Sequence, residues 1–175
     1  MAPVSGPPFL LEPLSATHQV ALCRTGEPLI DQYLHQDALA EQQRRIAAVY
    51  VAVNAANRVV TGFFSISPLG VRLSDPLMRH HPLLKTPYPV IGGFLLGRLG
   101  VHRSQQGAGI GGALVVLAIE KVRDASSQVG GMFLAVDPKT QRLADWYEKL
   151  GFVRLDPAPG KGSSRRMVLP LQTNE

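Results

Sequence analysis

The chain has 175 residues, 45% of them hydrophobic, and 18 Lys and Arg against 13 Asp and Glu give it a net charge of +5. This length and apolar content suit one domain with a buried core, and no apolar run approaches the length of a membrane span. The basic balance favours polyanionic partners, because non-specific affinity for nucleic acid is mostly electrostatic. We therefore expect a single domain without a membrane partner.

The ends of the chain and its one cysteine bear on where the protein works. Residues 1–8 have neither a charged start nor an apolar core, so we expect a disordered N-terminus without a secretion signal. We expect the domain to span residues 9–171, followed by a tail at 172–175. Cys23 cannot form an internal disulfide, which suits the cytoplasm, and we interpret it as a small buried hydrophobe rather than a nucleophile.

The first half of the chain reads as strands around one helix. We expect a strand at 9–14, a helix at 28–44, and strands at 47–54 and 59–67 joined by a turn at Ala56-Asn57. The expected helix has an apolar stripe made of Ile30, Tyr33, Leu34 and Ala38. Residues 68–89 contain five prolines and predict a loop with a short helix at 75–80. The adjacent His80 and His81 have no Cys or acidic partners nearby, so we expect no metal site.

A glycine-rich segment, Gln106-Gly-Ala-Gly-Ile-Gly-Gly112, separates two apolar runs. The run at 93–101 predicts a strand, and the run at 113–122 predicts a helix. Glycines let the main chain approach a ligand closely, and a helix start offers unpaired N–H groups and the positive end of a dipole. This arrangement is typical of a site for phosphate, and above all for a diphosphate.

Three phosphate-binding patterns overlap in this segment. A P-loop is excluded because Ala113 and Leu114 stand where it needs Lys and a hydroxyl. Gly107, Gly109 and Gly112 match the dinucleotide fingerprint G-x-G-x-x-G, but five residues separate the first glycine from its strand and 63 residues follow the last. The third pattern, Q/R-x-x-G-x-G/A, is the acyl-coenzyme A loop of the GNAT acetyltransferases, which this segment resembles.

A second motif lies downstream, in the expected helix that starts near Thr140 and ends Tyr147-Glu-Lys-Leu-Gly-Phe152. Leu143, Trp146, Tyr147 and Leu150 are spaced i, i+3, i+4, i+7, which predicts one apolar helix face. Gly151 is placed to end the helix. We expect strands at 132–136, 152–155 and 165–169 around it. Together with the glycine loop, this ending resembles the two GNAT signatures in their usual order.

Further segments resemble the toxin branch of that superfamily, found in type II toxin–antitoxin modules. The toxins share an opening G-E-P-x-L-D-x-W/Y-L and a core L-G-R-L-A-V-D-R-S-x-Q-G-x-G-L-G, matched here by residues 26–34 and 96–111. Pro87-Tyr-Pro-Val90 and a final Met-Val-Leu-Pro-Leu171 also match, so the resemblance runs from about residue 14 to 171. Three residues depart from the pattern. Gly100 stands where Ala is usual, His102 replaces an acidic residue, and Thr140 replaces Asn or Asp.

The resemblance implies a single-domain α/β (α+β) protein with the GNAT fold, in which about four helices flank a mixed, mostly antiparallel sheet of six or seven strands. It implies acetyl-CoA as cofactor and acetylation of the α-amino group of aminoacyl-tRNA, which blocks translation. It also implies a small DNA-binding antitoxin as partner and a homodimer. Alternatives are a GNAT acting on a small amine or a protein N-terminus, and a non-catalytic coenzyme A- or dinucleotide-binding module.

The resemblance also assigns roles to residues. The main chain near Leu99, Gly100 and Val101 would bind pantetheine and polarise the thioester oxygen. Tyr147 would protonate the departing thiolate, which is reasonable because phenols titrate near 10 and thiols near 8.5. The diphosphate would bind Gln106, Gly107, Ala108, Gly109, Ile110, Gly111 and Gly112.

Two features bear on the substrate: arginines that could position the RNA, and the lack of an obvious general base. We hypothesise that Arg98, Arg165 and Arg166 hold the acceptor end. An α-amine titrates at roughly 7.7–8.0, so it is partly neutral without help, whereas a lysine amine at about 10.4 is not. No strong general base stands out, although Asp31, Glu41 or Asp137 could fold toward the site.

Overall fold

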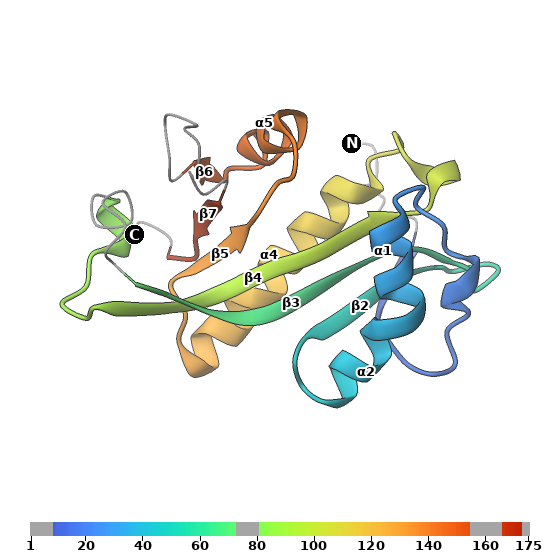
Figure 1. Ribbon diagram of the computed structural model, residues 1–175, viewed down its shortest axis with the longest axis horizontal. Coiled ribbons are helices and arrows are strands. Elements are labelled where there is room, and N and C mark those ends of the chain that lie inside the picture. Colours follow the sequence, from blue (N-terminus) through green and yellow to red (C-terminus); the bar gives the residue numbers. More distant parts are fainter. Residues whose placement is uncertain (1–8, 73–80, 155–165, 173–175) are drawn as a thin grey trace, which may run out of the picture. The chain divides into compact units, whose positions relative to one another are not determined.

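The computed structural model describes residues 9–72, 81–154 and 166–172 (Figure 1). Its seven-stranded sheet has the order β1-β2-β3-β4-β5-β7-β6. The β4–β5 pair is parallel, and the β1–β2, β2–β3, β5–β7 and β6–β7 pairs are antiparallel. The strands are β1 (Phe9–Pro13), β2 (Ala48–Asn54), β3 (Val60–Arg72), β4 (Val90–Val101), β5 (Phe133–Val136), β6 (Val153–Arg154) and β7 (Met167–Pro170). The expected mixed, mostly antiparallel sheet is confirmed.

Three helical stretches occur in the described residues. The first joins α1 (Pro28–Gln32), a π turn (Tyr33–Asp37) and α2 (Ala38–Gln43). The others are α4 (Ile110–Val129) and α5 (Gln141–Lys149). Short 3-10 turns lie at Val20–Leu22, Pro82–Leu84 and Arg103–Gln105. In the described parts of the chain, no helix is long and apolar enough to cross a membrane.

Two compact units make up the chain. The first unit contains residues 1–67 and 98–118, and the second contains residues 68–97 and 119–175. Strands β3 and β4 and helix α4 pass from one unit into the other. The first unit therefore carries the glycine segment, and the second carries Tyr147.

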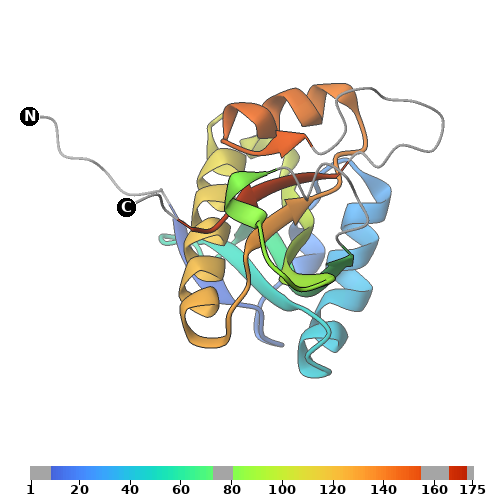
Figure 2. The ribbon, with the colours of Figure 1, turned by 90° about the vertical axis from the view of Figure 1, so that its left-hand side faces the viewer.

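In the first unit, successive residues of strand β3 face opposite sides of the sheet. Phe63 faces α1 and stacks on Tyr33 with ring centroids 6.2 Å apart, while the neighbouring Gly62 faces Leu114 of α4. Figure 2 shows these helices on opposite sides of β2 and β3. The core on the α1 side includes Leu14, Cys23, Tyr33, Leu34, Ala38, Val49, Val51, Val53, Val60 and Phe63. Burial removes both helix faces from water and is the main force holding them to the sheet.

The second unit has its own core around Phe133. Leu84, Ile91, Phe133, Ala135 and Val168 are buried there. A Cβ atom at Gly93 would lie 2.7 Å from the Phe133 ring, so strand β4 needs glycine where this ring packs over it. His81 has a local role, because its side chain accepts a hydrogen bond from the main chain of Leu83 and so starts the short 3-10 turn.

Two expected elements differ from the observed ones. The helix at 28–44 forms, but its middle is a π turn in which Ala38 N–H donates to Tyr33 C=O. The loop expected from Pro68 was wrong over its first five residues, because β3 continues to Arg72. Proline is tolerated there because the ladder with β2 ends at Ile66, so its missing N–H breaks no bond to β2. The expected helix at 75–80, with His80, and the expected tails at 1–8 and 173–175 lie outside the described residues.

Candidate active site

The glycine segment forms an open turn at the start of α4. Gly107 and Gly109 have φ angles of +82° and +83°, which side-chain-bearing residues rarely adopt. An added Cβ at either glycine, or at Gly112, would meet no heavy atom within 4 Å. The glycines are therefore required by the main-chain conformation, and the space beside them is open to a ligand.

Helix α4 directs unpaired N–H groups at this turn. Its first backbone bond runs from Ala113 N–H to Gly109 C=O at 3.1 Å, so the N–H groups of Ile110, Gly111 and Gly112 have no acceptor within the helix. The helix is 20 residues long and anchored by buried Leu114 and Ala118. The turn thus offers fixed donors and a positive dipole end, which suit a diphosphate.

The side chain of Gln106 braces the turn rather than facing outward as a donor. Its Nε2 donates to Thr25 C=O at 2.8 Å and to Val101 C=O at 3.0 Å. Both amide hydrogens are therefore used within the protein. Only the main chain of Gln106 remains for the role expected of it in binding phosphate.

The other end of this brace is held by the G-E-P-x-L-D motif. Asp31 Oδ1 accepts hydrogen bonds from the main-chain N–H and the hydroxyl of Thr25, both at 2.7 Å. Burial alone would raise the pKa of Asp31, but these hydrogen bonds lower it below its usual range. Gly26 supports the turn with φ +91°, and Pro28 begins α1. Sequence reasoning did not connect Thr25 to Gln106, because 81 residues separate them.

Strand β4 approaches this region without a side chain at Gly100. A Cβ there would lie 2.7 Å from the Phe63 ring, 2.8 Å from Thr25 and 2.9 Å from Ile30. The main chain at Gly100 therefore packs closely against the protein's own side chains. The ladder between β4 and β5 ends at Leu95 and Ala135. The main chain of β4 at residues 99–101 lies beyond it.

Arg98 lies on the same side of β4 as Gly100. It is exposed, and its guanidinium carbon is 5.2 Å from the centroid of the Tyr33 ring. Tyr33 itself donates to Glu41 at 2.9 Å, and burial raises its pKa to about 12. Arg98 therefore contacts the tyrosine of the opening motif through a cation–π interaction.

Helix α5 presents Tyr147 in the second unit. Thr140 caps its start by accepting from Leu143 N–H at 3.2 Å, and Gly151 follows its end with φ +98°. The Tyr147 ring packs edge-on between Trp146 and Phe152, with centroids 4.9 and 5.4 Å away. The expected apolar stripe was wrong at Leu143, which is 41% exposed.

The Tyr147 ring is buried, but its hydroxyl is not fully enclosed. The residue is 8% exposed, and burial raises its pKa to about 12. No hydrogen bond to this hydroxyl occurs among the described residues, in which every fully buried side-chain N or O atom has a partner. The hydroxyl therefore reaches the surface, protonated and ready to donate.

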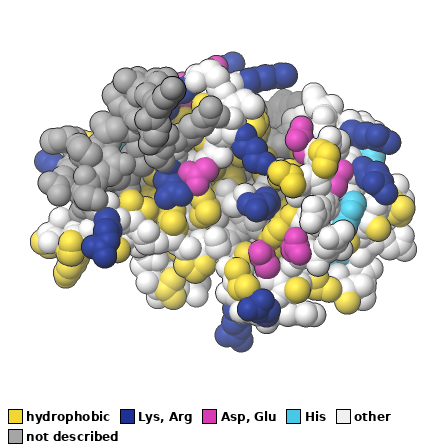
Figure 3. Space-filling view, in the orientation of Figure 1, with side chains coloured by type: hydrophobic (Ala, Val, Ile, Leu, Met, Phe, Trp, Pro, Cys, Tyr) yellow, Lys and Arg dark blue, Asp and Glu magenta, His cyan; other side chains and the backbone are white. Residues whose placement is uncertain are grey.

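The charged residues proposed for RNA are arranged unevenly. Arg166 forms a two-bond ion pair with Asp137, at 2.8 and 2.7 Å, which raises its own pKa. Arg165 lies outside the described residues. On the face shown in Figure 3, Lys and Arg are interspersed with acidic side chains rather than gathered in one patch.

The three carboxylates considered as general bases all have partners. Asp31 is bonded to Thr25, Glu41 to Tyr33 and Asp137 to Arg166. Cys23 is fully buried, and burial raises its pKa to about 12, as expected for a residue that is not a nucleophile.

Residues 25–152 match the model of the acetyltransferase (GNAT) family. This match covers most of the chain, so the protein belongs to the GNAT acetyltransferase family. This family membership favours an acetyltransferase over the dinucleotide-binding alternative.

The chain is also similar to individual proteins. The chain is 32% identical, over 117 residues, to a tRNA-acetylating toxin of Mycobacterium tuberculosis (strain ATCC 25618 / H37Rv), a match that covers 67% of this chain and 68% of that protein. It is similar to AtaT complexed with acetyl-methionyl-tRNAfMet, at 25% identity and a TM-score of 0.79, over 93% of this chain and 94% of that one. It is also similar to AtaTR bound with acetyl-CoA, at 25% identity and a TM-score of 0.77, with the same coverage.

Proposed function

We propose that this protein transfers acetyl from acetyl-CoA to the α-amino group of aminoacyl-tRNA and thereby acts as a translation-blocking toxin. The observation that carries the proposal is the open, left-handed glycine turn at the start of α4, in a GNAT chain similar to a tRNA-acetylating toxin. The likeness to AtaT, whose complexes contain acetyl-methionyl-tRNA and acetyl-CoA, supports both substrates.

The first unit offers the features that the donor needs. The main chain of residues 106–112 holds the diphosphate, since the turn is open and its N–H groups have no helical acceptor. The main chain of Leu99, Gly100 and Val101 would bind pantetheine, and an N–H group there would polarise the thioester oxygen. Acetyl-CoA supplies the acetyl group, and coenzyme A leaves as the thiolate.

Tyr147 acts as the acid in this scheme. Its hydroxyl donates to the departing sulfur, and solvent then restores the proton, since the hydroxyl is not fully enclosed. With a pKa raised to about 12, the phenol is a weaker acid than the sequence suggested, so its main contribution is a hydrogen bond to the developing negative charge.

The acceptor side needs little help with protons. An α-amine with a pKa of roughly 7.7–8.0 has a neutral fraction at pH 7, and water can remove the second proton after attack. The three partnered carboxylates described above are consistent with this, since none is held in reserve as a base. Arg98, Arg165 and Arg166 would help to position the RNA.

The remaining parts of the proposal concern the setting of the enzyme. We propose a small DNA-binding antitoxin as its partner, a homodimer as its assembled form, and the cytoplasm as its location. These follow from the resemblance to the toxin branch. Tyr147 and the coenzyme residues are proposed on the same basis, together with the geometry of each unit.

The decisive experiment is incubation of the protein with total charged tRNA and labelled acetyl-CoA, followed by identification of the acetylated species. We expect label on the α-amino group of at least one aminoacyl-tRNA and none on uncharged tRNA. Label only on free amines or on protein N-termini would replace the tRNA substrate by those acceptors. Thermal unfolding adds a check, because acetyl-CoA should raise Tm and NAD should not.

A further inference from the structure

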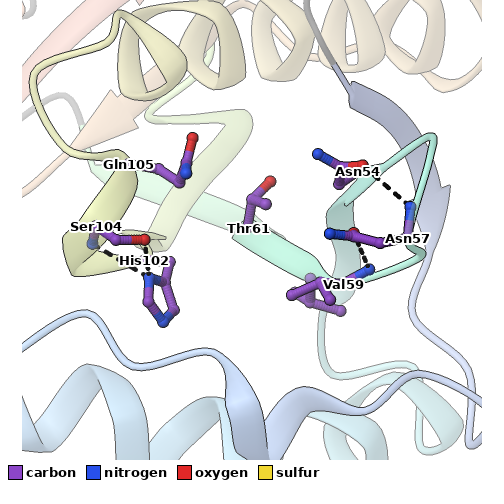
Figure 4. Close-up of a pocket in the computed structure, with 8 residues that line it drawn as sticks. Asn54, Asn57, Val59, Thr61, His102, Ser104 and Gln105 are labelled. Atoms are coloured by element: carbon purple, nitrogen blue, oxygen red, sulfur yellow. Dashed lines mark hydrogen bonds between the residues drawn. The ribbon is translucent and has the colours of Figure 1, made fainter.

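A small pocket of about 210 Å³, lined mainly by residues with uncharged polar side chains, lies within the first unit, beside the glycine turn (Figure 4). One wall comes from the β2–β3 hairpin, with Asn54 and Asn57, and the opposite wall from the segment just before the turn, with His102, Ser104 and Gln105. Thr61 lies between the walls in Figure 4, and Val59 and Val60 complete the lining. Pockets for whole drug-sized ligands start at about 300 Å³, so this one suits a single ring or group.

The hairpin fixes which atoms the two asparagines present. Asn54 Oδ1 accepts from the main-chain N–H of Ala56 and Asn57, at 2.9 and 3.2 Å, and Asn57 Oδ1 accepts from Val59 N–H at 3.1 Å. With both oxygens turned to the main chain, the amide nitrogens point toward Thr61 (Figure 4). Neither nitrogen has a hydrogen-bond acceptor in the described part of the chain. The pocket therefore presents two NH₂ groups.

Thr61 and His102 add an acceptor and a donor. The Thr61 hydroxyl donates to Ala52 C=O at 3.3 Å, which leaves its oxygen as an acceptor. His102 Nδ1 accepts from Ser104 N–H at 3.1 Å, so the neutral ring carries its hydrogen on Nε2. No carboxylate lines the pocket. A phosphate offers acceptors only, whereas the edge of a nucleobase offers donors and acceptors together and a face for the valines.

Two exposed arginines lie next to this pocket. Arg103 is between His102 and Ser104, and its main-chain N–H donates to Arg24 C=O at 2.8 Å. Among the described residues, neither Arg24 nor Arg103 forms an ion pair, unlike Arg58, Arg154 and Arg166. A neutral pocket beside unpaired guanidinium groups is what one nucleotide of a single strand requires, with its base inside and its phosphates outside.

We propose that this pocket holds one unpaired nucleobase of the acceptor RNA, with the adjoining phosphates on Arg24 and Arg103. The inference rests on the proposed aminoacyl-tRNA substrate and extends it to a defined contact site. It predicts that RNA affinity depends on the side-chain NH₂ groups of Asn54 and Asn57, whereas the affinity for acetyl-CoA does not.

The test uses Asn54→Asp and Asn57→Asp, which keep the oxygen that accepts from the main chain and replace only the amide nitrogen. We expect the KM for charged tRNA to rise about tenfold or more, since a hydrogen bond is lost and a repulsive charge gained, with kcat and the Kd for acetyl-CoA unchanged. Gln128→Glu, on the exposed surface of α4, is the matched control for the added charge. If both Asp variants match this control in KM, the pocket does not bind RNA. Circular dichroism checks the fold, and if one variant is unfolded, the other carries the test.

Abasic substrates distinguish recognition of a nucleobase from recognition of a phosphate. Chemically aminoacylated RNA hairpins would each lack one base among the unpaired nucleotides next to the charged ribose. We expect one such substrate to raise the wild-type KM as much as Asn57→Asp does, and the variant to add nothing further on that substrate. A full Asn57→Asp effect on every abasic substrate would overturn recognition of a base. Arg103→Gln should reduce the slope of log KM against log salt by about one, and an unchanged slope would remove the phosphate contact.

These outcomes differ from a failure of the proposed function itself. If the wild-type protein acetylates no aminoacyl-tRNA, the function is wrong, and the pocket proposal is overturned with it. If the wild type is active and the Asp variants behave like the Gln128→Glu control, the function stands and only the pocket proposal is wrong.

Discussion

Replacement of Tyr147 by Phe removes one hydroxyl and nothing else from the candidate site. The ring contacts with Trp146 and Phe152 are retained, because they involve the faces and edges of the rings. The hydroxyl has no hydrogen-bond partner among the described residues. Its loss should therefore change the free energy of unfolding by less than about 0.5 kcal/mol, the range of substitutions that remove no packing or bonded group.

The effect on catalysis should be much larger. A pKa of about 12 lies about 3.5 units above that of a thiol near 8.5, so complete proton transfer to the sulfur would be uphill by about 5 kcal/mol before the site adjusts either pKa. A charge-assisted hydrogen bond to the departing sulfur is worth about 1.5–3 kcal/mol, which sets a loss of about 10- to 150-fold in kcat. Full general-acid catalysis would extend the loss to about 10⁴-fold.

The assay measures free thiol release with charged tRNA as acceptor, alongside Tm and the Kd for acetyl-CoA. We expect kcat for Tyr147→Phe to fall at least tenfold, with Tm and Kd close to those of the wild type. Tyr88→Phe, at a tyrosine that is 69% exposed, is the control for loss of a phenol hydroxyl elsewhere. A kcat within threefold of the wild type, in a folded variant, would refute the role of Tyr147.

Three further outcomes test the electrostatics and packing. Gln106→Glu replaces the amide that donates to two carbonyls with a carboxylate that those carbonyls repel, so the Kd for acetyl-CoA should rise about tenfold. An unchanged Kd would show that these hydrogen bonds of Gln106 do not support acetyl-CoA binding. Gly100→Ala would put its methyl under 3 Å from three side-chain atoms and should cost about 1–3 kcal/mol of unfolding free energy in urea titrations; equal stability would contradict the packing. Because burial keeps Tyr147 protonated up to a pKa of about 12, kcat/KM should rise through the amine titration at roughly pH 8 and then stay level to about pH 10. A fall centred below about pH 9.5 would show that the acid has a lower pKa.

One more prediction concerns acid stability, in the ion pair between Glu12 and Arg58. The hydrogen bonds from Arg58, and then from His18, lower the pKa of Glu12 from 4.5 to about 2. A lowered pKa stabilises the fold above 4.5, and this contribution is lost as the pH falls toward 2. Urea midpoints of the wild type should therefore exceed those of Glu12→Gln at pH 6, and the difference should shrink by pH 2.5. A constant difference would contradict the linkage.

The sequence predicted the elements that depend on local patterns. The glycine segment, the stripe of Tyr33 and Leu34, and Gly151 at the end of α5 follow from periodicity and from backbone conformations that few residues tolerate. Where local signals conflicted with the sheet, they failed. Pro68 indicated a loop, but it lies in β3 past the ladder with β2, where no N–H is needed for β2. Leu143 fitted the helical period, but the buried face of α5 is centred on Ala144 and Tyr147.

The sequence by itself determined the family, the glycine turn and the tyrosine expected to act as acid, because these depend on residue types at fixed spacing along the chain. Only the tertiary structure decided what those residues touch. It turned the Gln106 amide inward to Thr25 and Val101, paired Arg166 with Asp137, and brought the hairpin asparagines opposite His102. Hydrogen bonds and packing act over a few ångströms of space, and residues 81 positions apart meet in this way without any signal in the local sequence.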